Sequence, residues 1–84
     1  MRYVLHVKAT NQTGILERIL GVVRFRGYHL RSLTATPTRD QSKMDVTLQV
    51  EHTRVRGNLS RQLSRLFDVE AVEMYSEVQQ ANFG

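Results

Sequence analysis

The chain has 84 residues, a mass of 9.7 kDa and a formal net charge of +4, with 12 Lys plus Arg against 8 Asp plus Glu. This length suits one small domain with a modest core and excludes a deep catalytic cavity between two lobes. With no cysteine and no metal-ligand spacing among its three histidines, the sequence predicts neither a disulfide nor a metal site.

Residues 3–10 alternate apolar and polar side chains, which predicts a strand that ends near Thr10. This segment lacks the apolar run of a signal peptide, and no later stretch is long enough to span a bilayer. We therefore expect a cytoplasmic protein without membrane contacts. From Gly14 the apolar spacing becomes helical and continues to Phe25, and Gly27 supplies the stop.

A second strand is predicted over residues 28–36, ended by Pro37. Its apolar residues change parity midway, which indicates either a bulge or partial cover on both faces. A proline at the end of a broken pattern favours an edge strand. Residues 44–50 alternate cleanly and predict a third strand.

The last third of the chain predicts a helix, a strand and a tail. Thr53 precedes the helical pattern, and residues 69–75 predict the final strand. Residues 79–84 show no periodic spacing of apolar residues and are expected to be a loose tail. The domain is therefore assigned to residues 1–78. Apolar residues of the second helical pattern are Val55, Leu59, Leu63 and Leu66, and Gly57 weakens its first turn.

This order of elements, βαββαβ, predicts an α+β, ferredoxin-like fold. Each helix connects two strands in the right-handed sense, so both helices are expected on one face of a four-stranded antiparallel sheet. The other face of the sheet must be solvated or covered by a partner.

The turn at residues 10–16 is the best candidate site. A glycine that opens a helix lets a ligand approach free backbone N–H donors, which favours a small anion. The alternative is a plain strand-to-helix turn, with Thr13 as the N-cap and Gly14 present for backbone freedom. The residues alone leave both interpretations open.

Two other functions are compatible with this order of elements. Residues 21–26 are superficially similar to the acylphosphatase loop, but they fall within and at the end of a helix instead of directly after the first strand. RNA recognition motifs stack bases on aromatic residues of the first and third strands, and residues 43–50 contain no aromatic residue. The dispersed arginines indicate solvated faces or an acidic partner protein, so we expect no nucleic-acid binding. Because the acylphosphatase-like segment lies in the wrong place, we also expect no catalytic residues.

Several segments resemble the ACT domain of acetolactate synthase small subunits. They are Asn11–Leu16 with Arg18, Gly21–Val23, Arg26–Leu30, Ser32–Thr38 and Gln62–Val69. The resemblance covers nearly the whole chain except the tail. Many family members carry a second, C-terminal domain after the ACT domain. Because this sequence resembles a single ACT unit, it is most similar to the short isozyme II type.

The resemblance implies a non-catalytic regulatory subunit. Family members bind the large, catalytic subunit of acetolactate synthase and raise its activity in the synthesis of valine, leucine and isoleucine. Thiamine diphosphate, FAD and Mg would belong to that partner, and no cofactor is expected in this chain. The alternative is a free-standing ACT-type sensor that binds an amino acid without an obligate enzyme partner.

The resemblance also implies an effector site. Asn11 and Gly14 correspond to the polar turn that holds the effector's charged groups, with the N–H groups of Ile15 and Leu16 facing its carboxylate. In valine-sensing members, the residue after the RGY or RGF turn is commonly asparagine, placed at the interface by the neighbouring protomer. Here that residue is His29, which is bulkier and can be charged. Valine feedback is therefore expected to be weak or absent.

ACT domains commonly pair side by side through the second strand. The edge strand predicted over residues 28–36 fits this mode, because an exposed edge offers unpaired backbone groups to a second copy. A homodimer is expected, with an interface formed by Tyr28, Leu30, Ser32, Leu33 and Thr34.

Overall fold

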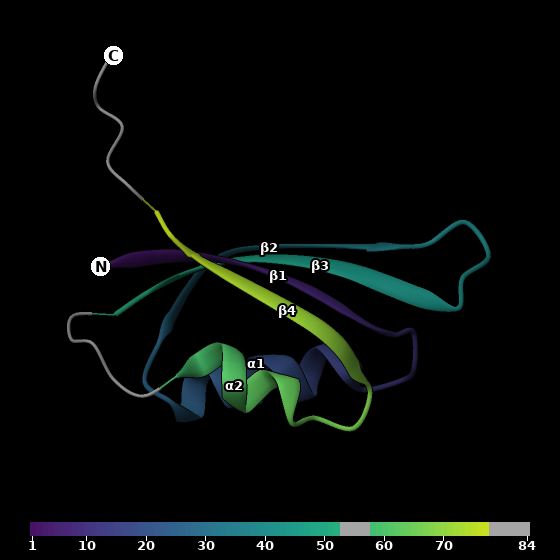
Figure 1. Cartoon of the computed structure of the whole chain (residues 1–84), viewed down its shortest axis with the longest axis horizontal. Coiled ribbons are helices and arrows are strands. Elements are labelled where there is room, and N and C mark those ends of the chain that lie inside the picture. Colours follow the sequence, from purple (N-terminus) through teal and green to yellow (C-terminus); the bar gives the residue numbers. More distant parts are fainter. Residues whose placement is uncertain (53–57, 78–84) are drawn as a thin grey trace, which may run out of the picture.

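The computed structural model describes residues 1–52 and 58–77. Both helices lie on the same side of one sheet (Figure 1). The strands pair antiparallel in the order β2-β3-β1-β4, which confirms the predicted ferredoxin-like α+β fold and places β2 at an edge. The elements are β1 (Arg2–Thr10), α1 (Ile15–Phe25), β2 (His29–Pro37), β3 (Lys43–Glu51), α2 (Leu59–Ser64) and β4 (Val69–Ser76).

The core lies between the sheet and the helix layer. The two central strands, β1 and β3, bury every second side chain against the helices, as the alternating sequence predicts. Helix α1 buries Ile15, Ile19 and Val23, which are spaced by four and share one face. The other fully covered residues are Leu5, Val7, Ala9, Val46, Leu48, Val50, Leu59 and Leu63.

A bulge in β2 explains the parity change in its sequence. Leu30 pairs with Val50 and Ser32 pairs with Gln49, so Arg31 is the extra residue between them. The bulge puts Leu30 and Leu33 on the same, helix-facing side although three positions separate them. One of the two sequence interpretations of β2 is thereby confirmed.

A second bulge, in β4, escaped the sequence analysis. Ala9 of β1 pairs with Val69 and the preceding residue pairs with Ala71, which leaves Glu70 unpaired in the ladder. Val69 and Val72 consequently both pack against the core. Their spacing of three within a strand was the signal that could have revealed the bulge.

The second helix begins later than predicted. It starts at Leu59, because Asn58 is extended and its side-chain oxygen accepts the backbone N–H of Arg61 as an N-cap. It ends at Ser64, so Leu66 lies in the following turn, where its N–H donates to the carbonyl of Leu63 at 3.0 Å. The predicted roles of residues 53, 55 and 57 and the predicted tail at 79–84 lie outside the described residues.

Candidate functional site

The β1–α1 turn owes its shape to one glycine. Gly14 adopts φ 84° and ψ 0°, a left-handed conformation that L-amino acids with a side chain rarely adopt. Gly14 is itself the N-cap of α1, and no side chain among the described residues caps the helix. The prediction that Thr13 is the N-cap is therefore wrong, whereas the need for backbone freedom at Gly14 is confirmed.

Asn11 ties this turn to the loop between β2 and β3. Its backbone N–H donates to the carbonyl of Ser42 at 3.0 Å, and its side-chain amide donates to the carbonyl of Gln41 at 3.0 Å. Gln41 has a positive φ of 67°, so the loop carbonyl is presented by an unusual backbone conformation. The Asn11 amide thus holds the β1–α1 turn and the β2–β3 loop together.

Asp40 in turn organises the β2–β3 loop. Its carboxylate accepts hydrogen bonds from the backbone N–H of Ser42 at 3.0 Å, the Ser42 hydroxyl at 2.8 Å and the Thr38 hydroxyl at 2.9 Å. These bonds, led by the Ser42 N–H, lower the pKa of Asp40 below its usual value, because they favour the ionised form. The loop that carries the acceptor for Asn11 is therefore fixed by its own carboxylate.

The charge nearest to the turn is Arg18, one helical turn beyond Gly14. A side-chain carbon placed on Gly14 would lie 3.8 Å from a guanidinium nitrogen of Arg18. The guanidinium forms an ion pair with Asp68, which is only 6% exposed, and the carbonyl of Asp68 accepts the N–H of Thr10 at 2.8 Å. Arg18 was not predicted as a site residue, although its spacing of four from Gly14 is a usable signal.

The backbone donors proposed for an effector carboxylate lie in the first turn of α1. The N–H of Ile15 donates to the carbonyl of Gln12 at 3.2 Å, so this donor already has an acceptor. Leu16 is half-buried beside it. An anion that enters here would have to share or displace the Gln12 carbonyl and would meet the guanidinium of Arg18.

His29 lies at the opposite end of the sheet from this turn. It pairs with Glu51, which pairs with Arg2 at the start of β1, whereas Asn11 follows the end of β1. Eight residue steps of about 3.3 Å each separate the two ends by about 26 Å. One protomer therefore brings Asn11, Gly14, Ile15 and Leu16 together and leaves His29 apart.

The β2 edge exposes part of the predicted dimer interface. Leu30 is 41% exposed, Ser32 and Thr34 are exposed, and Leu33 is half-buried against the core. Tyr28 differs from these, because it is only 6% exposed and packs edge-on against other rings within the protomer. Burial raises the pKa of Tyr28, and the negative charge that ionised Tyr3 would carry raises it further.

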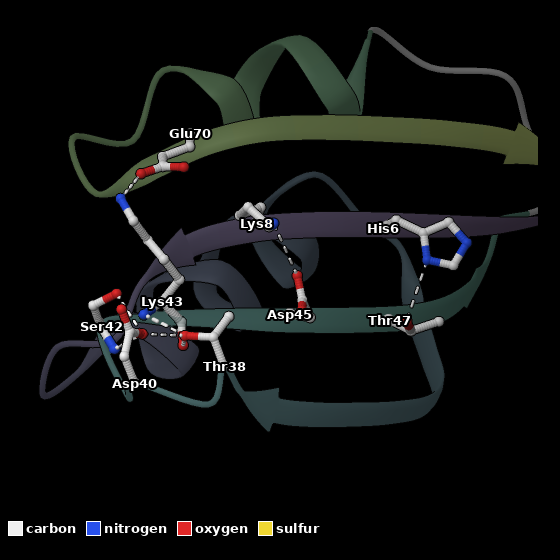
Figure 2. A network of polar contacts seen from close by, with 9 residues as sticks. All are labelled: His6, Lys8, Thr38, Asp40, Ser42, Lys43, Asp45, Thr47 and Glu70. Atoms are coloured by element: carbon white, nitrogen blue, oxygen red, sulfur yellow. Dashed lines mark hydrogen bonds and ion pairs between the residues drawn. The ribbon is translucent and has the colours of Figure 1, made fainter.

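Polar side chains cover the sheet face that the helices leave open. Figure 2 shows Lys8 beside Asp45, with 3.8 Å between the ammonium and carboxylate atoms, and His6 sharing a 3.2 Å hydrogen bond with Thr47. The bulge in β4 directs Glu70 across the sheet into an ion pair with Lys43. This face is therefore dominated by paired charges and hydrogen bonds.

Two absences hold for residues 1–52 and 58–77. No group of three or more His, Asp or Glu side chains there could hold a metal ion. No helix there is long and apolar enough to cross a membrane.

Comparison with known proteins relates this fold and turn to curated sequences. The ACT domain family matches residues 11–72. The isozyme 3 small subunit of acetolactate synthase from Escherichia coli (strain K12) is 39% identical over 70 residues, which cover 82% of this chain but 43% of that protein. The isozyme 2 small subunit from the same strain is 35% identical over 72 residues, covering 86% of this chain and 83% of that protein. The chain thus spans less than half of the longer relative and most of the shorter one.

A solved structure agrees on the fold. The ACT domain from the GTP pyrophosphokinase of Chlorobium tepidum superposes with a TM-score of 0.70 over 89% of this chain and 97% of that chain, at 15% identity. Its identity is low enough that it supports only the architecture. Together with the matched sequence over residues 11–72, these findings show that the chain belongs to the ACT domain family and is homologous to the small subunits of acetolactate synthase.

Proposed function

We propose that the chain is a non-catalytic regulatory subunit that binds the large subunit of acetolactate synthase and raises its activity in branched-chain amino acid biosynthesis. One observation carries the proposal, namely 35% identity to an isozyme 2 small subunit over 83% of that protein's length. Thiamine diphosphate, FAD and Mg would be held by the large subunit, and the complex would work in the cytoplasm.

The proposal includes a homodimer through β2. This strand is paired on one side only, by β3, so its outer backbone groups can extend the sheet into a second copy. Antiparallel pairing centred on Leu33 would set His29 of one protomer opposite Pro37 of the other. Pro37 precedes the loop that is hydrogen-bonded to Asn11. The partner's His29 would therefore approach the Asn11 turn of the first protomer, although within a single protomer His29 and this turn lie about 26 Å apart.

In this arrangement the effector site is shared between two protomers. Gly14 and Asn11 of one protomer would meet the partner's His29, where valine-sensing members commonly place asparagine. Asparagine presents a donor and an acceptor on one amide carbon, whereas the bulkier neutral imidazole carries its donor and its acceptor on two separate ring nitrogens and so presents them in a different geometry. Weak or absent valine feedback follows from this replacement.

The decisive experiment mixes the chain with a purified acetolactate synthase large subunit. We expect co-elution on size exclusion and a higher turnover than that of the large subunit alone. Absence of a complex together with an unchanged rate would overturn the proposed function.

The amino-acid sensor remains the second candidate, favoured by the turn itself. Gly14 keeps the left-handed conformation, and the guanidinium of Arg18 lies beside it. Calorimetry on the isolated chain with valine, leucine and isoleucine separates the two candidates. Tight binding of one of them without any large subunit would favour the sensor, whereas weak binding by a chain that activates the enzyme favours the regulatory subunit.

A further inference from the structure

The helix layer exposes two phenylalanines to solvent. Phe25, at the end of α1, is 82% exposed, and Phe67, in the turn after α2, is 96% exposed. An exposed phenylalanine indicates a binding surface where it adjoins further apolar side chains, and Phe25 does so, because it lines a groove together with Val22 and Leu66. Neither ring belongs to the core of the protomer.

A groove of about 380 Å³ lies between the outer sides of α1 and α2. Val22, Phe25 and Leu66 supply its apolar lining. Arg26 borders the groove and places its guanidinium 5.6 Å from the centre of the Phe25 ring. The groove can therefore accept an apolar side chain, with positive charge at its border.

Gly21 contributes to this groove, and no contact with residues 1–52 or 58–77 requires a glycine there. It lies in the middle of α1, its φ is not positive, and a side-chain carbon placed on it would meet no atom of those residues within 4 Å. Glycine inside a helix lowers stability relative to alanine. A glycine at this position leaves room for another molecule to approach the backbone of α1 closely.

Charge is distributed unevenly between the two faces of the molecule. On the sheet face, Lys8 and Lys43 are ion-paired. On the helix layer, Arg26, Arg61 and Arg65 are exposed and form no salt bridge with any described residue. The helix layer therefore complements a partner that carries carboxylates around apolar side chains.

We propose that this outer surface of the helices is the docking site for an acidic, apolar-bearing surface of the large subunit. The inference rests on the proposed function, which supplies the partner. A second copy of the chain fits less well, because it would bring arginines against arginines. A phosphate backbone or a lipid surface would use the arginines but leave the glycine at the groove unexplained. The docking surface consists of groove-lining residues and of exposed residues next to them in sequence. The groove is lined by Gly21, Val22, Phe25, Arg26, Gln62 and Leu66, and the exposed neighbours in sequence are Arg61, Arg65 and Phe67.

The first test fills the groove. Gly21→Leu is expected to weaken large-subunit binding by about 10-fold or more, because the added side chain occupies the space the partner needs. Gly21→Ala is expected to weaken binding less while raising Tm by about 4 °C, since alanine favours the helix. A structural defect cannot produce that combination of a more stable chain and weaker binding.

The second test removes charge on one face at a time. Arg61→Gln/Arg65→Gln should weaken binding by about 3- to 10-fold and reduce its dependence on salt. Lys8→Gln/Lys43→Gln removes the same net charge from the sheet face and should leave binding unchanged. Binding is measured by titration calorimetry at about 0.1 M and about 0.5 M NaCl, because the higher salt concentration screens exposed charges more strongly.

The outcomes separate the docking site from the proposed function. If the unmodified chain binds and Gly21→Leu and Arg61→Gln/Arg65→Gln bind equally well, the docking site is wrong and the proposed function stands. If the unmodified chain does not bind the large subunit, both fail. Loss of binding only in the sheet-face variant would also overturn the docking site. In a further outcome, the chain fails to bind the large subunit and instead sediments with phosphatidylglycerol vesicles or is retained on duplex DNA. If Arg61→Gln/Arg65→Gln abolishes that binding, the helix face belongs to another partner.

Discussion

Two glycines of the same chain have opposite roles, and their backbone angles decide which. Gly14 has φ 84°, so a side chain there strains the turn, and we expect Gly14→Ala to lower the free energy of unfolding by about 1–2 kcal/mol. Gly21 is helical with open space around it, so Gly21→Ala should raise the free energy by up to about 1 kcal/mol. Urea denaturation measures both, and a Gly14→Ala chain as stable as the original would contradict the left-handed turn.

Arg18 connects the candidate effector turn to the turn between α2 and β4 through its ion pair with buried Asp68. Removing the guanidinium leaves a buried carboxylate without its cation, so Arg18→Ala should cost about 1–3 kcal/mol of stability. Arg24→Ala is the matched control, because Arg24 is exposed and forms no salt bridge with a described residue, and its effect should stay within about 0.5 kcal/mol. Equal effects of the two changes on thermal unfolding would refute the structural role of the pair.

At the scale of elements, the sequence predicted what depends on local periodicity. The alternation in β1 and β3 and the spacing of Ile15, Ile19 and Val23 placed three elements correctly, because each buries one regular face. The start of α2 was missed, since the apolar spacing continued upstream while Asn58 capped the helix at Leu59. Capping depends on one residue's backbone conformation, which periodicity does not report.

The candidate site was only partly predictable for a related reason. The sequence located the turn at Gly14 but gave no sign that the Asn11 amide would donate to the carbonyl of Gln41, thirty positions away. Such contacts depend on how the β2–β3 loop folds over the end of β1. The ion pair between Arg18 and Asp68 joins residues that are even further apart, 50 positions, so it too became visible only in the folded chain.

The β2–β3 loop should confer a pH dependence on stability. The hydrogen bonds from Ser42 and Thr38 lower the folded pKa of Asp40 below 3.8, so its stabilising contribution is complete above that pH and is lost as pH falls through the folded value. Asp40→Asn removes this titration, so its stability should fall less than that of the original chain between about pH 5 and pH 2. Glu17→Gln is the control, since Glu17 has no hydrogen-bond partner among the described side chains.

A carbon-detected NMR titration tests the same element directly. The Asp40 carboxyl should titrate below 3.8 in the folded chain. A midpoint at or above that value, or identical acid stability for the original chain and Asp40→Asn, would show that the three hydrogen bonds do not hold the loop in solution.

At the scale of the whole molecule, His29 lies too far from Asn11 to reach the effector site of its own protomer. An effect of His29 on effector binding would therefore show that two protomers form the site. If the partner's His29 enters the site, His29→Asn should tighten valine binding by about 10-fold, because one restored hydrogen bond supplies roughly that factor. The exposed His6 on the open sheet face is the matched control, and His6→Asn should leave the calorimetric affinity unchanged. Equal affinities for the His29→Asn variant and the original chain would remove His29 from the effector site.

The dimer itself depends on which of the two edge strands is used. We expect a mass of about 19 kDa by light scattering, twice the 9.7 kDa of the chain. Leu30→Lys/Thr34→Lys places charges on the exposed β2 edge, inside the interface that pairing through β2 would form, and should yield monomers. Ala71→Lys/Tyr75→Lys adds the same charge to exposed positions of β4 and should remain dimeric. If the β4 variant alone dissociates, the chain pairs through β4, and the partner's His29 can no longer reach the Gly14 turn.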